Sequence, residues 1–284
     1  MRLSELIAET RAALGTMPEA SLDARLIVQH FTATTATDAI SRPETPIAAE
    51  AVTAVRAAVG RRRRGEPVHR ILGFRAFHGL TLQLSPGTLE PRPDTEALVD
   101  TVLSHVRDMV GRKGGCRILD LGTGTGAIAL ALLAQVPQAT ALGVDISDDA
   151  LETARRNADL NQMADRFETA RSDWFSNLQG RFDVIVSNPP YIESAAIAGL
   201  APEVRDHDPP AALDGGEDGL DAYRIIAAGA ASCLEAQGVV AVEIGMGQGP
   251  QVVELFAENG YRLIESADDL AGHQRALVFR SRGD

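Results

Sequence analysis

Short apolar segments alternate with helical patterns along the chain from Asp94 onward. Strands that alternate with helices form a mostly parallel, doubly wound sheet, because each helix returns the chain to the same edge of the sheet. Ligands of such sheets bind at the carboxyl ends of the strands. The segments expected to form strands lie near 117–121, 140–144, 167–171, 183–186, 239–244, 262–264 and 276–279. The alternation therefore predicts an α/β fold with a site where these strands end.

The first 68 residues carry a different pattern. Apolar residues recur at helical spacing over 3–14, 22–31 and 47–59, which predicts a small helical bundle. Between 71 and 84 the pattern changes to short β-rich pieces around Gly79, which is typical of a hairpin. We therefore expect a helical domain at 1–68, a β-hairpin linker at 69–92 and a larger domain at 93–284.

A glycine-rich loop follows the first of the expected strands and precedes a helical run. Glycines let the backbone approach a ligand, and the helix N-terminus behind them offers unpaired N–H groups. The loop also fits the dinucleotide fingerprint G-x-G-x-x-A, which makes a nicotinamide enzyme an alternative. The carboxylate of Asp120 argues against that alternative, since it would repel a pyrophosphate and suits an ammonium group. The candidate cofactor-binding residues of this loop are Asp120, Gly122, Thr123, Gly124, Thr125 and Gly126.

Two acidic residues and the single tryptophan follow the next two expected strands. Asp145 ends the second strand, where a carboxylate can accept hydrogen bonds from both ribose hydroxyls of a nucleoside. Ser172-Asp173-Trp174 follows the third strand and offers a polar group for an adenine edge and an aromatic face for its ring. Taken singly, Asp145 and Asp173 suit solvated loops and Trp174 suits a core. In this order and spacing they indicate a nucleoside pocket.

The tetrapeptide Asn188-Pro189-Pro190-Tyr191 follows the fourth expected strand. Asn188 offers a side-chain carbonyl, and the carbonyl of Pro189 can accept a second hydrogen bond, so both could grip one planar amino group. The prolines restrict the backbone before them, which places the two acceptors rigidly. Tyr191 either packs against the substrate or is an ordinary buried aromatic. A plain strand-ending turn is the alternative interpretation of the tetrapeptide.

Together these motifs resemble those of class I S-adenosylmethionine methyltransferases, and more narrowly those of the HemK/PrmC family of release factor glutamine methyltransferases. The resemblance covers most of the chain and is specific, because Arg-Pro-x-Thr-Glu together with Asn-Pro-Pro-Tyr separates this family from nucleic-acid methyltransferases that share only the latter. Further segments that carry it are Gly73-Phe74-Arg75, 77–80, Pro91-Arg92-Pro93-Asp94-Thr95-Glu96, 202–204, 212–216, 218–220, Glu243-Ile244-Gly245, 269–272 and Arg275.

The resemblance implies a Rossmann-like seven-stranded class I methyltransferase domain, with S-adenosylmethionine as cofactor and S-adenosylhomocysteine as product. It implies that the methyl group goes to the side-chain amide nitrogen, N5, of the glutamine in the Gly-Gly-Gln motif of peptide chain release factors. The expected catalytic residues are Asn188, Pro189 and Tyr191, and Pro190 joins them in binding substrate. Asn188 is also expected beside the cofactor. The helical domain is expected to dock the protein substrate.

Three departures from the family pattern stand out. Glu90 occupies a position that is usually apolar, Asp208-Pro209 replaces Glu-Pro, and His273-Gln274 stands where an acidic residue is common. The first two are conservative enough to leave the assignment intact. No function is transferred to the loop that contains His273.

Composition indicates an enzyme of the cytoplasm. The net charge of −12 argues against tight binding of a nucleic-acid backbone, and we found neither a bilayer-length apolar run nor a secretory signal. Cys116 and Cys233 are distant in sequence and near no histidine pair, so neither a disulfide framework nor a metal site is expected. The basic run 61–64 suits either a solvated helix end or a contact for an acidic partner. We expect a monomer.

Two alternatives remain open at this point. An adenine-N6 or guanine-N2 methyltransferase meets the same chemical problem, because an exocyclic amino group conjugated to a ring is also a poor nucleophile. A non-catalytic module that binds S-adenosylmethionine is the alternative from another class. Methyl incorporation into oligonucleotide would favour the first, and cofactor binding without transfer would favour the second.

Overall fold

The computed structural model describes residues 1–17 and 19–283 and divides into two compact units, Met1–Phe74 and a larger one from Arg75 onward. The first unit is helical, as expected. Its helices are α1 (Leu3–Leu14), α2 (Ala20–Thr32), α3 (Ala36–Ser41), α4 (Ala49–Arg63) and α5 (Val68–Leu72). Helices α3 and α5 were not predicted from the sequence, because they are too short to show a periodic apolar face.

The basic run 61–64 lies at the end of α4, but its arginines are not equivalent. Arg62 is only 4% exposed and donates through Nε to Asp23 of α2 at 2.6 Å. Arg61 pairs with Glu66, whereas Arg63 and Arg64 are exposed. The run therefore contributes one arginine to the interior of the helical unit.

The expected hairpin is formed by β1 (Phe74–Phe77) and β2 (Leu80–Gln83), and all of it except Phe74 belongs to the larger unit. Its turn contains His78 and Gly79 with φ of 46° and 81°, a conformation that suits glycine and a two-residue hairpin turn. A short 3-10 helix, η1 (Pro93–Thr95), then leads into α6 (Glu96–Lys113). The boundaries expected at 68 and 92 stay a prediction.

A seven-stranded sheet forms the centre of the larger unit, with the order β5-β4-β3-β6-β7-β9-β8. Strands β3 to β7 pair in parallel, and β9 runs antiparallel to both β7 and β8. The mostly parallel sheet predicted from the alternation is thus confirmed. The strands are β3 (Cys116–Leu121), β4 (Ala139–Asp145), β5 (Phe167–Arg171), β6 (Phe182–Ser187), β7 (Leu234–Glu243), β8 (Tyr261–Asp268) and β9 (Gln274–Ser281).

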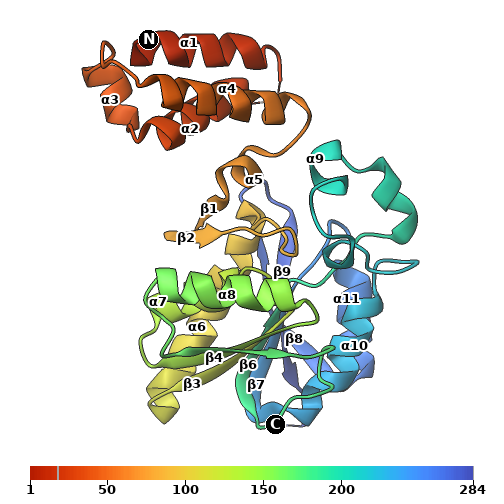
Figure 1. Cartoon of the computed structure of the whole chain (residues 1–284). Helices are drawn as coiled ribbons and strands as arrows, with labels where there is room; N and C mark the ends of the chain where they lie inside the picture. Colours follow the sequence, from red (N-terminus) through yellow and green to blue (C-terminus); the bar gives the residue numbers. More distant parts are fainter. Residues whose placement is uncertain (18, 284) are drawn as a thin grey trace. The chain divides into compact units, whose positions relative to one another are not determined.

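Helices cover both faces of the sheet (Figure 1). Ile118 of β3 faces a core shared with α6, α7 (Ala127–Gln135) and α8 (Asp148–Leu160). Leu119 faces the opposite core, shared with α10 (Asp221–Gly229) and α11 (Gly249–Glu258). Successive strand residues point to opposite faces, so a strand buried on both sides is apolar throughout. Burial on both faces explains why the central strands appear in the sequence as continuous apolar runs.

A long connection joins β6 to α10 and contains only short helices, η2 (Ser194–Gly199), α9 (Pro202–Arg205) and η3 (Pro210–Ala212). A further 3-10 helix, η4 (Ala230–Ser232), precedes β7. The connection leaves the sheet at the carboxyl end of β6, the edge at which a doubly wound sheet binds its ligands.

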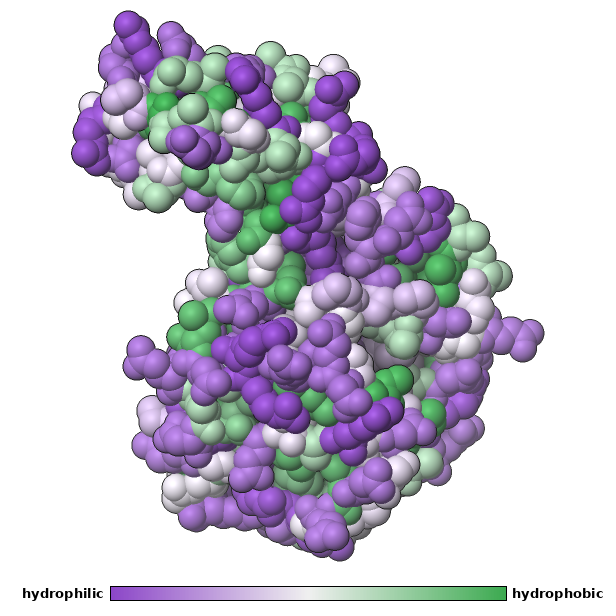
Figure 2. Space-filling view, viewed as in Figure 1, coloured by the Kyte–Doolittle hydropathy of each residue, from purple (hydrophilic) through white to green (hydrophobic). Residues whose placement is uncertain are grey.

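Hydrophilic residues cover much of the surface shown in Figure 2, with apolar residues in small groups among them. Within 1–17 and 19–283, no helix combines the length and apolar character needed to cross a membrane. Both cysteines are buried, and burial raises the pKa of the Cys116 thiol to about 12. The described residues contain no cluster of metal-ligating side chains.

Candidate functional site

A cavity of about 410 Å³ opens at the carboxyl ends of β3, β4 and β6. This volume lies within the range of ~300–1,000 Å³ typical of small-molecule sites. The predicted residues that line it are Gly122, Thr123, Gly124, Thr125, Asp145, Asp173, Trp174, Asn188 and Pro190. The structure thus gathers residues from four separate sequence motifs around one space.

The glycine loop lies at one side of the cavity and connects β3 to α7. Gly122, Gly124 and Gly126 all have positive φ, and a Cβ on Gly126 would lie 3.1 Å from the Leu130 side chain. Gly126 is the N-cap of α7 rather than part of the cavity wall. The glycines therefore provide a tight turn that leaves the loop backbone next to the cavity.

Asp145 links the loop to the end of β4. Its two carboxylate oxygens accept from the N–H groups of Gly124 at 3.0 Å and Ser147 at 2.9 Å. Burial raises the pKa of Asp145, and these backbone hydrogen bonds oppose the rise. A carboxylate has room for further donors beyond two, so Asp145 can also accept from hydroxyl groups in the cavity.

Asp120 lies beneath the loop and does not line the cavity. Its Oδ2 accepts from the Thr123 hydroxyl at 2.8 Å and from the Ala129 N–H at 3.4 Å. Burial raises its pKa to about 7, and Oδ1 has no hydrogen-bond partner among the described residues. The expected contact with an ammonium group stays a prediction, and the hydrogen bonds indicate support of the loop.

Another part of the cavity wall comes from the segment that follows β5. Trp174 lines the cavity with a φ of 49°, a conformation that a bulky residue rarely adopts, and Ser172 donates to its carbonyl at 2.8 Å. Ile146, on the neighbouring strand end, also lines the cavity although 53% of its surface is exposed. An aromatic and an aliphatic side chain at the same site suit a flat ring.

Asn188 and Pro190 line the cavity, whereas Pro189 is buried and Tyr191 is partly buried outside the cavity wall. The Asn188 amide donates to the Thr95 hydroxyl at 3.1 Å. The Tyr191 hydroxyl donates to Glu243 Oε1 at 3.4 Å. The tetrapeptide is thus fixed from both ends by residues at η1 and at the end of β7.

The backbone of Tyr191 is packed against the loop 214–219. A Cβ on Gly215 would lie 2.8 Å from the Tyr191 Cα, and one on Gly219 would lie 2.5 Å from its carbonyl oxygen. The Gln248 amide donates both to that carbonyl at 3.0 Å and to the Gly219 carbonyl at 3.3 Å. The close approach of this loop to the Tyr191 backbone explains why Gly215 and Gly219 are glycines.

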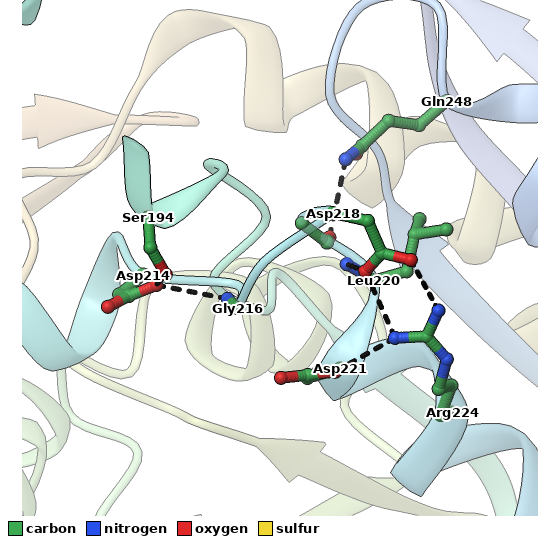
Figure 3. A network of polar contacts seen from close by, with 9 residues as sticks. Ser194, Asp214, Gly216, Asp218, Leu220, Asp221, Arg224 and Gln248 are labelled. Atoms are coloured by element: carbon green, nitrogen blue, oxygen red, sulfur yellow. Dashed lines mark hydrogen bonds and ion pairs between the residues drawn. The ribbon is translucent and has the colours of Figure 1, made fainter. Parts of the chain in front are cut away.

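Polar contacts also shape this loop itself (Figure 3). Asp214 accepts from the Ser194 hydroxyl at 2.6 Å and from the Gly216 N–H at 3.0 Å. Arg224 of α10 pairs with Asp218 and Asp221 on the other side. These bonds shape the loop against which the tetrapeptide packs.

The cavity fits the cofactor implied by the sequence. Asp145 supplies acceptors for ribose hydroxyls, and Trp174 with Ile146 supplies apolar faces for a base. The glycine loop leaves room for the remaining chain, and Oδ1 of Asp120 below it has no hydrogen-bond partner among the described residues. Among the described residues that line the cavity, Arg92 is the only basic one, so the wall lacks a cluster of positive charges that would attract a pyrophosphate.

Two of the departures from the family pattern are explained by ion pairs. Glu90, only 4% exposed, pairs with Arg75, and Asp208, 5% exposed, pairs with Arg92. The Glu90 N–H also donates to Asp208 at 3.4 Å. In the third departure, the backbone N–H of His273 donates to Asp269 at 2.9 Å, and His273 is not among the residues that line the cavity.

Several residues that lie in or behind the site had no role predicted from the sequence. Thr95, Glu243 and Gly215 lie in segments that carry the family resemblance, and this position was the one indication of a role that the sequence offered. Gln248 lay outside every motif. The lining residues missed are Gly87, Leu89, Pro91, Arg92, Thr95, Ala127, Ile128, Val144, Ile146, Ser147, Pro209, Ala211 and Ala212.

Comparison with known families gives two matches. Residues 95–203 match the methyltransferase small domain, and residues 5–73 match the PrmC N-terminal domain. The first match spans the glycine loop and the Asn-Pro-Pro-Tyr tetrapeptide. The second covers nearly all of the helical unit.

Among solved structures, a methyltransferase from Pyrococcus furiosus is similar in fold, with a TM-score of 0.53 and 19% identity over 79% of this chain and 98% of that one. A release factor glutamine methyltransferase from Rhodospirillum rubrum is 45% identical over 92% of this chain and 78% of its own length. One from Agrobacterium fabrum is 53% identical over 98% of this chain and 96% of its own length. The chain belongs to the family of release factor glutamine methyltransferases.

Proposed function

We propose that this protein methylates the side-chain amide nitrogen, N5, of the glutamine in the Gly-Gly-Gln motif of peptide chain release factors, with S-adenosylmethionine as the methyl donor. The observation that carries the proposal is that Asn188 and Pro190 line the same cavity as Asp145 and Trp174, the residues proposed to hold the nucleoside. Similarity to two proteins named release factor glutamine methyltransferase, over 98% and 92% of this chain, supports a release factor as the substrate.

The proposed role of Asn188 and Pro189 is to orient the amide. When bound, the cofactor supplies an electrophilic methyl group on a sulfonium that leaves easily. An amide nitrogen is a poor nucleophile because its lone pair is delocalised into the carbonyl. Asn188 Oδ1 and the Pro189 carbonyl each accept one N–H and aim the nitrogen, which would gain the methyl group as the bond from that group to sulfur breaks and would then give one proton to solvent water. These contacts strengthen as positive charge develops on nitrogen.

The proposed cofactor site consists of the glycine loop, Asp145 and the segment with Asp173 and Trp174. Asp145 accepts from the ribose, Trp174 contacts the base, and the backbone at Gly122 and Gly124 lies beside the amino-acid part. Alignment accounts for most of the acceleration that this arrangement provides. Tyr191 contributes by fixing the tetrapeptide against Glu243.

We further propose that residues 1–68 dock the release factor, with the protein acting as a monomer in the cytoplasm. The exposed Arg63 and Arg64 offer charge for an acidic partner. The charge-reversed variant Arg63→Glu/Arg64→Glu should raise KM for intact release factor and leave kcat unchanged. Unchanged KM would remove these two arginines from the docking surface.

Mass spectrometry of unmethylated release factor after incubation with the protein and cofactor tests the main proposal. One added methyl group on the Gly-Gly-Gln glutamine is expected. Transfer to oligonucleotides without transfer to release factor would instead establish the nucleic-acid alternative. Cofactor binding without transfer to either substrate would point to a binding module.

A further inference from the structure

The segment 84–92, which the sequence placed within a linker, forms part of the cavity wall. Gly87, Leu89, Pro91 and Arg92 all line the cavity. The segment contains neither helix nor strand, so no ladder of backbone hydrogen bonds holds it beside the sheet. Contacts with another element must therefore keep this wall in place.

Asn157 of α8 provides one such contact, and it also reaches the glycine loop. Its side chain is 0% exposed. Its Oδ1 accepts from the Gln83 N–H at 2.7 Å, and its Nδ2 donates to the carbonyls of Gln83 at 3.1 Å and Thr125 at 2.9 Å. Both hydrogens of the amide nitrogen are used, and the Gln83 N–H can meet only the oxygen. One buried side chain thus joins the start of the segment to the glycine loop.

Asp149, in the first turn of α8, provides a second contact. The Gly87 N–H donates to Asp149 Oδ2 at 2.7 Å. A Cβ on Gly87 would lie 2.5 Å from that oxygen and 3.0 Å from Ser147 Oγ, so the segment approaches α8 as closely as a glycine allows. The segment is therefore attached to α8 at Gln83, where it begins, and at Gly87, where it reaches the cavity.

Asn161, one turn beyond Asn157, makes a similar contact that does not involve the cavity. Its Nδ2 donates to the carbonyls of Thr81 at 3.0 Å and Asn157 at 2.8 Å. Neither Thr81 nor Asn161 lines the cavity. Asn161 therefore supports the hairpin, whereas Asn157 supports both the hairpin and the glycine loop.

We propose that Asn157 and Asp149 are positioning residues that hold the segment 84–92 as a preformed wall of the cofactor site. This inference rests on the proposed function. Neither side chain lines the cavity, so both act through the segment that does. A wall that is ordered before binding spares the cofactor the entropy of ordering it, so loss of either contact weakens cofactor affinity.

Calorimetric binding of S-adenosylhomocysteine to Asp149→Ala and Asp149→Asn tests the Asp149 contact. Alanine removes the acceptor at an exposed position, so the fold should persist while affinity falls about 3- to 10-fold. Asparagine keeps an oxygen for the Gly87 N–H and should restore affinity to within about twofold. Asp148→Ala is the matched control, because it removes the same charge from the same turn of α8 but its carboxylate pairs with Arg171.

Asn157→Asp tests the contact that joins the two walls. Aspartate keeps the shape but turns an oxygen toward two carbonyl oxygens, so affinity should fall about 10- to 100-fold. Stopped-flow fluorescence of Trp174, which lines the cavity, should show faster release. Asn161→Asp is the control, since its nitrogen also meets two carbonyls, and its affinity should stay within about twofold of wild type. A residue that only stabilised the fold would change unfolding in both variants and affinity in neither.

Steady-state kinetics should show the same division. In Asn157→Asp and Asp149→Ala, KM for S-adenosylmethionine should rise in proportion to the loss of affinity. The kcat at saturating cofactor should stay within about threefold of wild type, because the tetrapeptide keeps its own contacts. A fall in kcat without a rise in KM would contradict the proposed role.

Two further results would overturn the inference: equal affinity in Asp149→Ala and Asp148→Ala, or a folded Asn157→Asp that binds as tightly as Asn161→Asp. If Asn157→Asp does not fold, the Asp149 variants decide by themselves. A wild-type protein that does not bind S-adenosylhomocysteine would reject the proposed function. A wild type that binds it, with variants no weaker than their controls, would reject only the positioning role.

Discussion

The Asn188 side chain donates a 3.1 Å hydrogen bond to the hydroxyl of Thr95, a residue 93 positions earlier in the chain. This bond joins the segment before α6 to the tetrapeptide after β6. It occupies the donor end of the Asn188 amide and leaves the oxygen as an acceptor for the substrate.

Removal of the Asn188 amide should impair chemistry. Asn188→Ala should lower kcat on release factor by about 10²- to 10³-fold, comparable to the loss of one oxyanion-hole donor, because the oriented acceptor disappears. Cofactor affinity measured by calorimetry should change little. Asn259→Ala, at the exposed end of α11, is the control and should retain full turnover. Wild-type kcat in Asn188→Ala would exclude the amide grip.

Removal of the Asp145 charge should impair cofactor binding. Asp145→Asn keeps an acceptor for the loop but loses charge-assisted hydrogen bonds, so the calorimetric affinity for S-adenosylmethionine should fall about 10- to 100-fold. Asp148→Asn, which removes only an exposed pair with Arg171, should bind normally. Equal affinity in both variants would remove Asp145 from the ribose contact.

A methyl group on Gly215 should disturb the tetrapeptide. Its Cβ would lie 2.8 Å from the Tyr191 Cα and 2.9 Å from the Pro190 carbonyl oxygen, so Gly215→Ala should cost about 1–3 kcal/mol of stability or lower kcat as the backbone shifts. A Cβ on Gly199 meets nothing within 4 Å, which makes Gly199→Ala the matched control. Denaturant unfolding and kcat of the two variants should differ. Equal stability and equal kcat in the two variants would mean that the backbone at Tyr191 accommodates the added methyl group.

Asp120 should make the larger unit less stable as pH rises. Its pKa is about 7 when folded and about 4 when unfolded, so the folded state binds more protons between these values. Its destabilising contribution therefore grows from about pH 4 to about pH 7 and reaches at most about 4 kcal/mol. Glu243 acts with the same sign, so wild type and Asp120→Asn must be compared at each pH.

Urea unfolding followed by the fluorescence of Trp174, the single tryptophan, measures this effect. The stability lost between about pH 5 and about pH 8 should be smaller in Asp120→Asn than in wild type. Asp165→Asn, at an exposed position, should behave as wild type. An equal pH dependence in Asp120→Asn would show that Asp120 titrates normally in the folded state.

The buried pair of Arg62 and Asp23 should govern the stability of the helical unit. Arg62→Met leaves Asp23 without this partner in the interior, at a cost of about 3–5 kcal/mol. Helical circular dichroism should then be lost before the fluorescence of Trp174 changes. Arg63→Met, at the exposed neighbouring position, should leave the helical transition unchanged. A small loss of stability in Arg62→Met would mean that the ion pair contributes little to the stability of the helical unit.

Local patterns in the sequence were sufficient for the architecture. Alternating apolar and helical segments predicted the mostly parallel sheet, because burial on both faces makes central strands continuously apolar. Strand ends then located Asp145, Trp174 and Asn188 at one edge, since parallel strands carry their loops there. The family resemblance added the chemistry. The exact ends of β7 and β8 and the short helices α3 and α5 were missed, since short elements leave little periodic signal.

The sheet, the glycine loop and the tetrapeptide could be predicted from local sequence alone, because these features depend on residues close together in the chain. The folded chain brings Thr95 against Asn188 and Gly215 against Tyr191, and it buries Arg62 while Arg63 stays exposed. These relationships join segments far apart in sequence. They follow from how helices and loops pack on the sheet, which spacing along the chain does not specify.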